Sequence, residues 1–528
     1  MFTVCKQIIA YFYKQYKLKK ILSNLIDSRE LFKYYYLEII QCKAVLFNQE
    51  GKEVCQKGRL LTMLTPHPLW TERDMDELWE KNAACIQDII KESHIDPHQI
   101  KGLSCSGHGK GLYLWGKDNK PVRNGIVSTD GRAKDIVSQW MKEGVAKKVF
   151  ARNYQSLLAS QPVSLLRWLK EEEKDNYDNI QWVFEVKDYI RFKLTGEAYA
   201  ELTDYSGSNL YDLTHEGFSS ELLSWFGIED IIDCLPPLKK SCDICGYVTE
   251  EIAHLTGLPV GIPVAGGMFD IDSCAIAMNI VDSSHLCCIA GTWSINEFIT
   301  KQPIVNHTIM MNSLYCVEPY YLVEECSPTS AGNLEWYIKM FMEKEKEEAQ
   351  KQGKNIYAYA DELVASVTKD DDSLFFLPFI YGSNYNPSSK ACFLGLDAHH
   401  TRSDMIKAVF EGIIFCHCIH IEKLLANKKD FESIRLAGGA ANSAVWTQMF
   451  SDILGYPIET VRVKELGALG VAMAAAVAAK TYPTLQDAAA HMTKSGTVVY
   501  PNEAKKVWYQ AKFKKYKALY LDLEKFWT

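Results

Sequence analysis

Positive charge is in short supply in this sequence. Its 58 Lys and Arg residues are outnumbered by 66 Asp and Glu residues, which gives a formal net charge of −8 over 528 residues. Proteins that bind nucleic acid usually carry a basic patch or stripe. The charge balance therefore argues against a nucleic-acid partner and favours a cytoplasmic protein that binds small molecules.

Long apolar runs are also absent from the basic N-terminal segment. Residues 1–33 hold seven Lys or Arg against two acidic residues, and no apolar run among them approaches the ~20 residues that span a membrane. The apolar core and small-residue cleavage site of a secretory signal are missing too. We interpret 1–33 as an atypical extension without a function, and we expect no membrane partner. A basic helix lying on a membrane surface is the alternative.

The cysteines do not form a metal-binding pattern. Cys242 and Cys245 make a single C-x-x-C pair without a second pair at zinc spacing, and the 16 cysteines are scattered along the chain. Cys416-His417-Cys418 lies in an apolar helical pattern, where packing in the core explains it. We expect reduced thiols and no dedicated metal site.

The dinucleotide-binding fingerprint is absent as well. No expected strand is followed by G-x-G-x-x-G and then by an acidic residue about 20 positions later. A dinucleotide-dependent dehydrogenase is therefore a weak alternative, suggested only by pairs of adjacent glycines.

One such pair lies in the most informative segment of the chain. Ile434–Ala437 reads as a buried strand, Gly438 and Gly439 follow it, and a helix is expected over Ala444–Leu454. Glycines between a strand and a helix N-terminus allow a nucleotide to approach the backbone, because no Cβ is in the way. Close packing of the strand on the helix is the alternative explanation.

The length of the chain favours two domains. A strand over 44–47 and a turn over 48–51 open the first, and Asp74 with Glu77 predicts a capping box on a helix that reaches about Glu92. The Pro- and Gly-rich segment 258–263 separates two stretches with similar strand–hairpin–helix patterns. We place the domains at 34–258 and 259–528.

Several motifs, in order along the chain, resemble the FGGY family of carbohydrate kinases. These are Ser106–Gly111, Ser128–Arg132, Gly266–Asp270, Gly291–Thr292, Gly395–Leu396 with Asp404–Met405 and Ala408–Gly412, and Ile434–Ser443. Within the family, segments 162–169 and 327–336 are most similar to L-xylulose kinases. Several ordered motifs are more specific than any one of them.

The resemblance implies an α/β fold with two related actin- and hexokinase-like (ribonuclease H-like) domains that flank a cleft. The first would bind sugar and the second would bind nucleotide. The implied activity is phosphorylation of a sugar hydroxyl by ATP, with a ketopentose such as L-xylulose or a related ketose or sugar acid as substrate. Mg²⁺ would arrive with ATP, bound through phosphates and water rather than through a ligand cluster. A homodimer is left open.

The resemblance also assigns roles to individual residues. Asp270 would be the catalytic base, with Asp272 as its nearby competitor, although an Asp after glycines is also a common turn former. The expected sugar-binding residues are Trp70, Glu72, His108, Lys110, Asp130 and Arg132. The expected nucleotide-binding residues are Gly291, Thr292, Gly438, Gly439 and Asn442. For Asp130 and Arg132 an ion pair within the loop is the alternative, and for Trp70 a place in the core.

One family feature is missing. Members of the family open with a strand, an Asp-x-Gly-Thr-like turn and a second strand, whereas the corresponding segment 35–45 contains neither glycine nor aspartate. Ile39 and Ile40 cannot offer the close backbone approach to a phosphate that glycine offers. The alternative function is therefore a pseudokinase or damaged gene copy that binds sugar without transferring phosphate.

Overall fold

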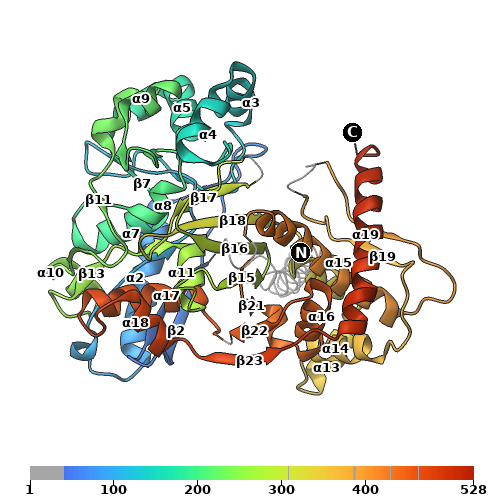
Figure 1. The fold of residues 1–528 in the computed structure, drawn as a ribbon. Helices are drawn as coiled ribbons and strands as arrows, with labels where there is room; N and C mark the ends of the chain where they lie inside the picture. Colours follow the sequence, from blue (N-terminus) through green and yellow to red (C-terminus); the bar gives the residue numbers. More distant parts are fainter. Residues whose placement is uncertain (1–40, 307–308, 384–387, 429, 462, 528) are drawn as a thin grey trace, which may run out of the picture.

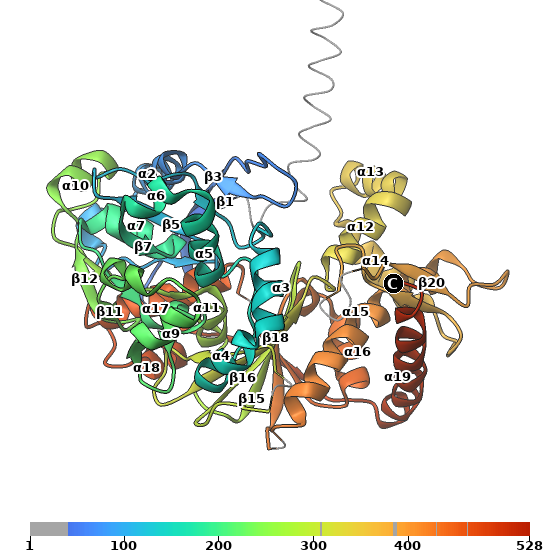
Figure 2. The same cartoon turned by 90° about the horizontal axis from the view of Figure 1, so that it is seen from above.

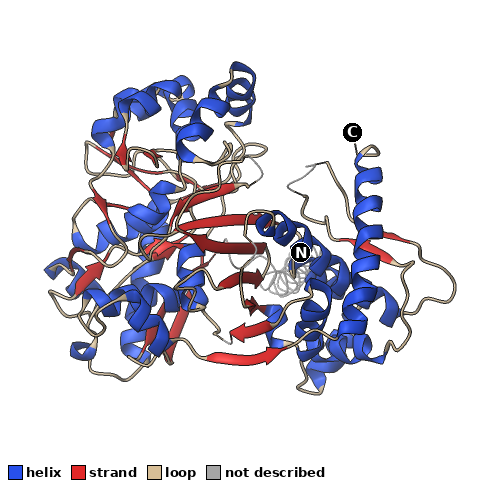
Figure 3. Cartoon of the chain, viewed as in Figure 1, coloured by secondary structure: helices blue, strands red, loops and turns tan. Residues whose placement is uncertain are grey.

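The computed structural model describes residues 41–306, 309–383, 388–428, 430–461 and 463–527. Helices and strands alternate in both halves of this part of the chain (Figure 3). The earlier elements gather on one side of a central sheet together with the helices over 466–492, and the helices over 332–366, 402–425, 444–454 and 503–524 stand on the other side (Figures 1 and 2). The basic N-terminal segment 1–33 and residues 35–40 of the segment without glycine or aspartate lie outside the described residues.

The central sheet has seven strands in the order β17-β18-β16-β15-β21-β22-β23. The strands are β15 (His285–Ala290), β16 (Ser294–Thr300), β17 (Met311–Leu314), β18 (Tyr321–Ser327), β21 (Ser433–Gly438), β22 (Ile458–Val461) and β23 (Ser495–Val499). β15, β16, β18 and β17 are antiparallel neighbours, β21 and β22 continue parallel to β15, and β23 closes the sheet antiparallel. Within this sheet, the antiparallel strands β18, β16 and β15, followed by the parallel strands β21 and β22, make the ribonuclease H-like arrangement, as predicted.

Alternating side chains of β15 separate two cores. Cys288 belongs to the core that contains helices α12, α14, α15, α16 and α19, whereas Cys287 belongs to the core that contains α11, α17 and α18. A strand buried on both faces reads as a continuous apolar run, which explains the sequence 286–290. The helices of this half are α11 (Asp270–Ala277), α12 (Gly332–Phe341), α13 (Glu343–Lys351), α14 (Ile356–Ser366), α15 (Arg402–Leu425), α16 (Ala444–Leu454), α17 (Leu466–Ala478), α18 (Leu485–Met492) and α19 (Glu503–Glu524). A short hairpin, β19 (Phe375–Leu377) and β20 (Cys392–Leu394), packs beside α15.

The alanine-rich helix α17 is largely buried and packs closely on α11. One sequence expectation about these helices is confirmed. His417 is fully buried in α15, and its ring bonds to Ser294 and Ser330 at 3.1 Å, so the Cys416-His417-Cys418 motif belongs to the core. Among the helices of the described segments, none has both the length and the apolar character needed to cross a membrane.

In the described residues the first half is rich in helices and has only two-stranded strand pairs. Its helices are α2 (Met75–Glu92), α3 (Lys134–Glu143), α4 (Val145–Asn153), α5 (Pro162–Glu172), α6 (Lys174–Asp178), α7 (Val186–Thr195), α8 (Leu202–Ser206), α9 (Ser220–Trp225) and α10 (Glu250–Thr256). Its strands are β1 (Gln41–Phe47), β2 (Glu53–Leu60), β3 (Glu72–Arg73), β4 (Ser106–Gly107), β5 (Tyr113–Gly116), β6 (Gly125–Ile126), β7 (Ile180–Phe184), β8 (Ala200–Glu201), β9 (Tyr211–Asp212), β10 (Gly217–Phe218), β11 (Leu238–Lys239), β12 (Ile244–Tyr247), β13 (Pro263–Ala265) and β14 (Met268–Phe269).

The start of this half agrees with the sequence in most respects. β1 and β2 are antiparallel and join through the expected turn, in which the Gly51 amide donates to the Asn48 carbonyl at 3.0 Å. Asp74 caps α2 by accepting from the Glu77 amide at 2.8 Å. The predicted capping box is incomplete, because the Glu77 carboxylate bonds to Thr62 and Lys81 instead of returning to the cap.

Candidate active site

A continuous cleft is lined by both halves of the chain. Its lining includes His108 and Lys110 from the first half, and Asp270, Glu324 and the backbone at Gly291–Thr292 and Gly438 from the second. Six of the twelve site residues predicted from the sequence therefore line one cleft. They come from loops and strand ends, where functional side chains are commonly held.

Asp270 reaches the cleft because two short strands lie side by side. β14 runs parallel to β4, so that Phe269 is opposite Gly107. Gly267 makes this approach possible: its φ is +88°, and a Cβ there would lie 2.2 Å from the Cys105 carbonyl oxygen. Asp270, the first residue of α11, is thus placed beside the 106–111 loop.

The surroundings of Asp270 suit a proton acceptor near neutral pH. Burial, followed by the nearby Glu324 carboxylate, raises the pKa of Asp270 to about 7, against the opposing effect of Lys110. A base with a pKa near the working pH is efficient in proton transfer. Asp272, its competitor, is fully buried, does not line the cleft, and accepts from the Cys316 amide at 3.0 Å.

Lys110 faces Asp270 from a strained loop. Its φ is +66°, a conformation uncommon for a residue with a side chain. Burial alone would lower the pKa of Lys110, but the carboxylates of Glu324, Asp270 and Asp204 raise it above its ordinary value. No hydrogen bond or ion pair joins its ammonium group to another described residue. A charged donor is thus held in the cleft with its hydrogen-bonding capacity unused.

His108 is placed differently from Lys110. Its Nε2 is 3.0 Å from the Tyr113 hydroxyl, and its Nδ1 is near the Gly109 carbonyl. Burial, and then the charge of Arg73, lowers the pKa of His108 to about 4. The ring is therefore neutral at physiological pH, and it supports the loop from inside while it also lines the cleft.

The other four expected sugar-binding residues form a separate cluster. Arg132 donates to Asp130 at 2.9 Å and to Glu72 at 2.8 Å, and its guanidinium lies 4.1 Å from the centre of the Trp70 ring. These three charged side chains are buried, and none of the four residues lines the cleft. Their neighbours Thr71 and Thr129 do line it. The cluster therefore holds two cleft-lining segments in place, with its own charges already paired.

The expected nucleotide-binding glycines Gly291 and Gly438 lie at the carboxyl ends of two neighbouring central strands of the sheet. β15 and β21 are parallel, and Gly438 is opposite Ala290, directly before Gly291. Gly438 has a φ of +87°, and a Cβ there would be 2.5 Å from the Ala290 carbonyl oxygen. Two motifs far apart in the sequence thus form one glycine-lined floor. Exposed backbone of this kind suits the close approach of a nucleotide or its phosphates.

The segment that follows Gly438 continues from the carboxyl end of β21 into a short turn. Gly439–Asn442 forms a 3₁₀ turn, and Gly439 and Asn442 are exposed. Ser443 then caps α16 by accepting from the Trp446 amide at 2.9 Å. The strand, the glycine turn and the helix over Ala444–Leu454 are confirmed as predicted.

One acidic residue of the cleft was missed from the sequence. Glu324 lies in β18, which is otherwise largely apolar, and it is only 3% exposed. Two consecutive carboxylates in a buried strand, Glu324 and Glu325, were the available signal. A buried charge is costly unless it is paired or used, so its position needed an explanation.

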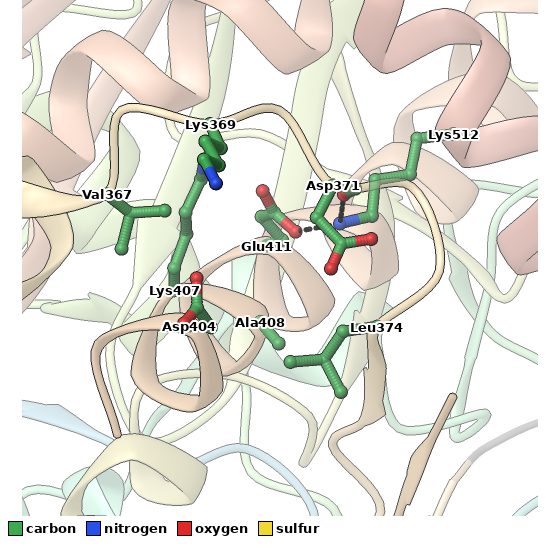
Figure 4. Close-up of a pocket in the computed structure, with 9 residues that line it drawn as sticks. All are labelled: Val367, Lys369, Asp371, Leu374, Asp404, Lys407, Ala408, Glu411 and Lys512. Carbon is green, nitrogen blue, oxygen red and sulfur yellow. Dashed lines mark hydrogen bonds and ion pairs between the residues drawn. The ribbon is translucent and has the colours of Figure 1, made fainter. Parts of the chain in front are cut away.

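A smaller pocket lies elsewhere and shares no residue with the cleft (Figure 4). Lys512 crosses it and donates to the Glu411 carboxylate at 2.6 Å and to the Asp371 carbonyl at 2.7 Å. Since these charged groups satisfy one another, the pocket is explained by packing between α15, α19 and the segment 367–374.

Comparison with known proteins shows which family the chain resembles over most of its length. The N-terminal domain model of the FGGY family of carbohydrate kinases matches residues 40–277, and the C-terminal domain model matches residues 286–479. The chain is 37% identical to the L-xylulose/3-keto-L-gulonate kinase of Escherichia coli, over 92% of this chain and 95% of that protein. It is 36% identical to a probable L-xylulose kinase of Pasteurella multocida, over 92% and 98%.

Solved structures agree in fold. A ligand-bound xylulose kinase from Lactobacillus acidophilus superposes with a TM-score of 0.83 at 22% identity, over 92% of this chain and 96% of that one. A xylulose kinase from Rhodospirillum rubrum gives a TM-score of 0.80 at 24% identity, over 93% and 98%. At these identities the likeness establishes the two-domain fold alone.

Proposed function

This chain belongs to the FGGY family of carbohydrate kinases, and we propose that its substrate is a ketopentose such as L-xylulose or a related keto sugar acid. The reaction is transfer of a phosphoryl group from ATP to a sugar hydroxyl. The choice of substrate is supported by two relatives at 36–37% identity, which are named for L-xylulose and, in one case, also for 3-keto-L-gulonate.

The observation that carries the proposed mechanism is the position of Asp270 opposite Lys110 in the cleft. Asp270 accepts the proton of the sugar hydroxyl as the oxygen attacks the terminal phosphorus. Lys110 donates hydrogen bonds to other hydroxyls of the sugar and so fixes its orientation. Positioning of this kind supplies much of the rate in phosphoryl transfer, where the protein does little covalent chemistry.

The glycine-lined floor formed by Gly291 and Gly438 binds the nucleotide. The backbone amide and hydroxyl at Gly291–Thr292 hold the phosphates, and Gly438, Gly439 and Asn442 border the rest of ATP. The Gly291 carbonyl accepts from the Ala331 amide at 2.8 Å, which fixes the turn before any ligand binds. Preorganised donors stabilise developing charge without further rearrangement.

Mg²⁺ would accompany ATP. In the described ranges no three His, Cys, Asp or Glu side chains form a cluster that could hold a metal. The residues fit an ion held mainly by phosphates and water, with Asp270 as an acidic side chain in the cleft that is free of an ion pair. When bound, the ion would neutralise phosphate charge. A cytoplasmic location, where ATP is made available and thiols stay reduced, completes the proposal.

The binding-only alternative has no observation in its favour. Of the segment that suggested it, residues 35–40 lie outside the described residues, and residues 41–45 form the regular first part of β1. The dehydrogenase alternative fails on fold, because the central sheet begins with three antiparallel strands rather than with parallel βαβ units.

The test is direct. The purified chain is incubated with MgATP and, separately, with L-xylulose, other ketopentoses and 3-keto-L-gulonate, and phosphorylated products are identified by mass spectrometry. We expect a phosphorylated product from at least one of these sugars. The substrate proposal is wrong if only sugars outside this set, such as glycerol or an aldose, are phosphorylated.

A further inference from the structure

Glu324 is a carboxylate in the cleft for which no role has yet been assigned. It lies in β18, opposite Glu297 of β16 and Met311 of β17. The next residue, Glu325, points to the other face of the sheet, where it bonds to His420 and Lys423 on α15. Strand alternation therefore places the two carboxylates on opposite faces of β18. Both residues line the cleft, but the Glu325 carboxylate is already paired.

The carboxylate of Glu324 has one oxygen that the protein itself does not use, although the group also interacts with the Cys326 thiol. The side chain is 3% exposed, and its Oε2 has no hydrogen-bond partner among the described residues. A buried acceptor without a partner costs free energy, which a bound ligand can recover. Glu297, its neighbour across the strands, is fully buried and does not line the cleft, so it offers no partner.

Glu324 and Asp270 both act electrostatically on Lys110, and neither forms an ion pair with it. All three side chains line the same cleft. One ammonium group balances about one of the two carboxylates. An additional carboxylate on a ligand would enter surroundings that are already negative, where like charges repel strongly because water is scarce.

We propose that Glu324 is a specificity-determining residue, which makes the sugar end of the cleft select uncharged ketoses over sugar acids. A neutral sugar can donate a hydroxyl to Glu324 Oε2 and accept from Lys110 through another oxygen. A sugar acid would place its carboxylate near Lys110 but also near Glu324. The inference rests on the proposed function, since it requires that the sugar binds between Lys110 and Asp270.

The experiment compares two substrates in matched variants. Initial rates are measured with L-xylulose and with 3-keto-L-gulonate in the parent, in Glu324→Gln and in Glu347→Gln. Glu347 is an exposed residue of α13 that forms no ion pair among the described residues, so its variant removes the same charge far from the sugar. Binding of both sugars without ATP is measured by calorimetry, and melting temperatures verify folding.

We expect the parent to prefer the neutral sugar in kcat/KM, and Glu324→Gln to lower that preference by about tenfold or more. Glu347→Gln should keep the parental ratio. A third variant, Glu324→Met, separates charge from hydrogen bonding. It should lower the preference as Gln does, and it should also bind L-xylulose more weakly than the Gln variant, because it has no polar group.

Two results would overturn the inference alone. The first is a parent that prefers the sugar acid, and the second is a Glu324→Gln variant whose ratio stays within about twofold of the parent's. In both cases sugar is phosphorylated, so the proposed function stands. If the parent neither binds nor phosphorylates either sugar, the proposed function fails and the inference fails with it.

Discussion

Replacing Asp270 with Asn separates catalysis from stability in this protein. The substitution keeps the size of the side chain and removes the proton acceptor. Loss of a general base typically lowers the rate by about 10²–10⁴-fold, and we expect kcat to fall by that factor. Affinity for the sugar should change only a few-fold, because Lys110 and the cleft remain in place.

The same change should make the protein more stable. The pKa of Asp270 rises from its ordinary value of 3.8 to about 7, so the folded state holds the ionised carboxylate at a cost. At ~1.4 kcal/mol per pKa unit, the upper limit of that cost is about 4 kcal/mol. Partial exposure to water screens the charge, so we expect a gain of about 1–3 kcal/mol in the free energy of unfolding.

The gain should depend on pH in a definite direction. A carboxyl group whose pKa is raised on folding carries no penalty below about pH 4, where it is protonated in both states. The penalty grows between about pH 4 and pH 7 and is complete above pH 7. Asn avoids it, so the variant should exceed the parent in stability more at pH 8 than at pH 5.

Urea unfolding at the two pH values and a coupled ADP-release assay measure these effects, with Asp272→Asn as the control. Activity of the parent should fall as pH drops below about 7, because the base becomes protonated. Normal turnover by Asp270→Asn would refute the reasoning and direct attention to Asp272. A loss of activity that merely follows a loss of stability would refute it as well.

Three further substitutions test other parts of the site. Lys110→Met should raise the KM for the sugar by about tenfold or more and leave the KM for ATP nearly unchanged, since it removes only a charged donor to the sugar. Gly438→Ala should raise the KM for ATP and lower the free energy of unfolding by about 1–3 kcal/mol, because its Cβ would clash and its φ is positive. Gly144→Ala, with a φ of +79° but open space around it, is the matched control and should cost about 1 kcal/mol without affecting ATP. Arg132→Met should destabilise the fold by about 3–5 kcal/mol in urea unfolding, because it leaves the buried Asp130 without its ion-pair partner and Glu72 with Arg123 alone. An unchanged KM in either of the first two variants, or an unchanged stability in the last, would contradict these roles.

Local patterns in the sequence predicted local structure well. The strand, glycines and helix around Gly438 appear where they were expected, and α16 spans the predicted residues Ala444–Leu454. Each of these features depends on neighbours a few positions apart, namely helical periodicity, a side-chain cap and a glycine stop. The two-domain fold followed from the order of the motifs along the chain.

Contacts between distant segments could not be predicted in this way. The pairing that places Gly438 beside Gly291 joins residues far apart in the sequence, and only the order of strands in the sheet produces it. The buried pairing of Arg132 with Glu72 depends equally on tertiary packing, whereas its pair with Asp130 is local and was one of the two alternatives from the sequence. Glu324 was missed because its neighbour Glu325 is also acidic, and only the tertiary structure decides which of the two carboxylates is paired with His420 and Lys423.

The most direct measurement is the formation of phosphorylated sugar by the purified full chain with MgATP and L-xylulose, with Asp270→Asn measured beside it. We predict a sugar phosphate and an equal amount of ADP from the parent, and at least about 10²-fold less of both from the variant. Sugar binding by the parent without any phosphorylated product would contradict the assignment of this chain as a working kinase.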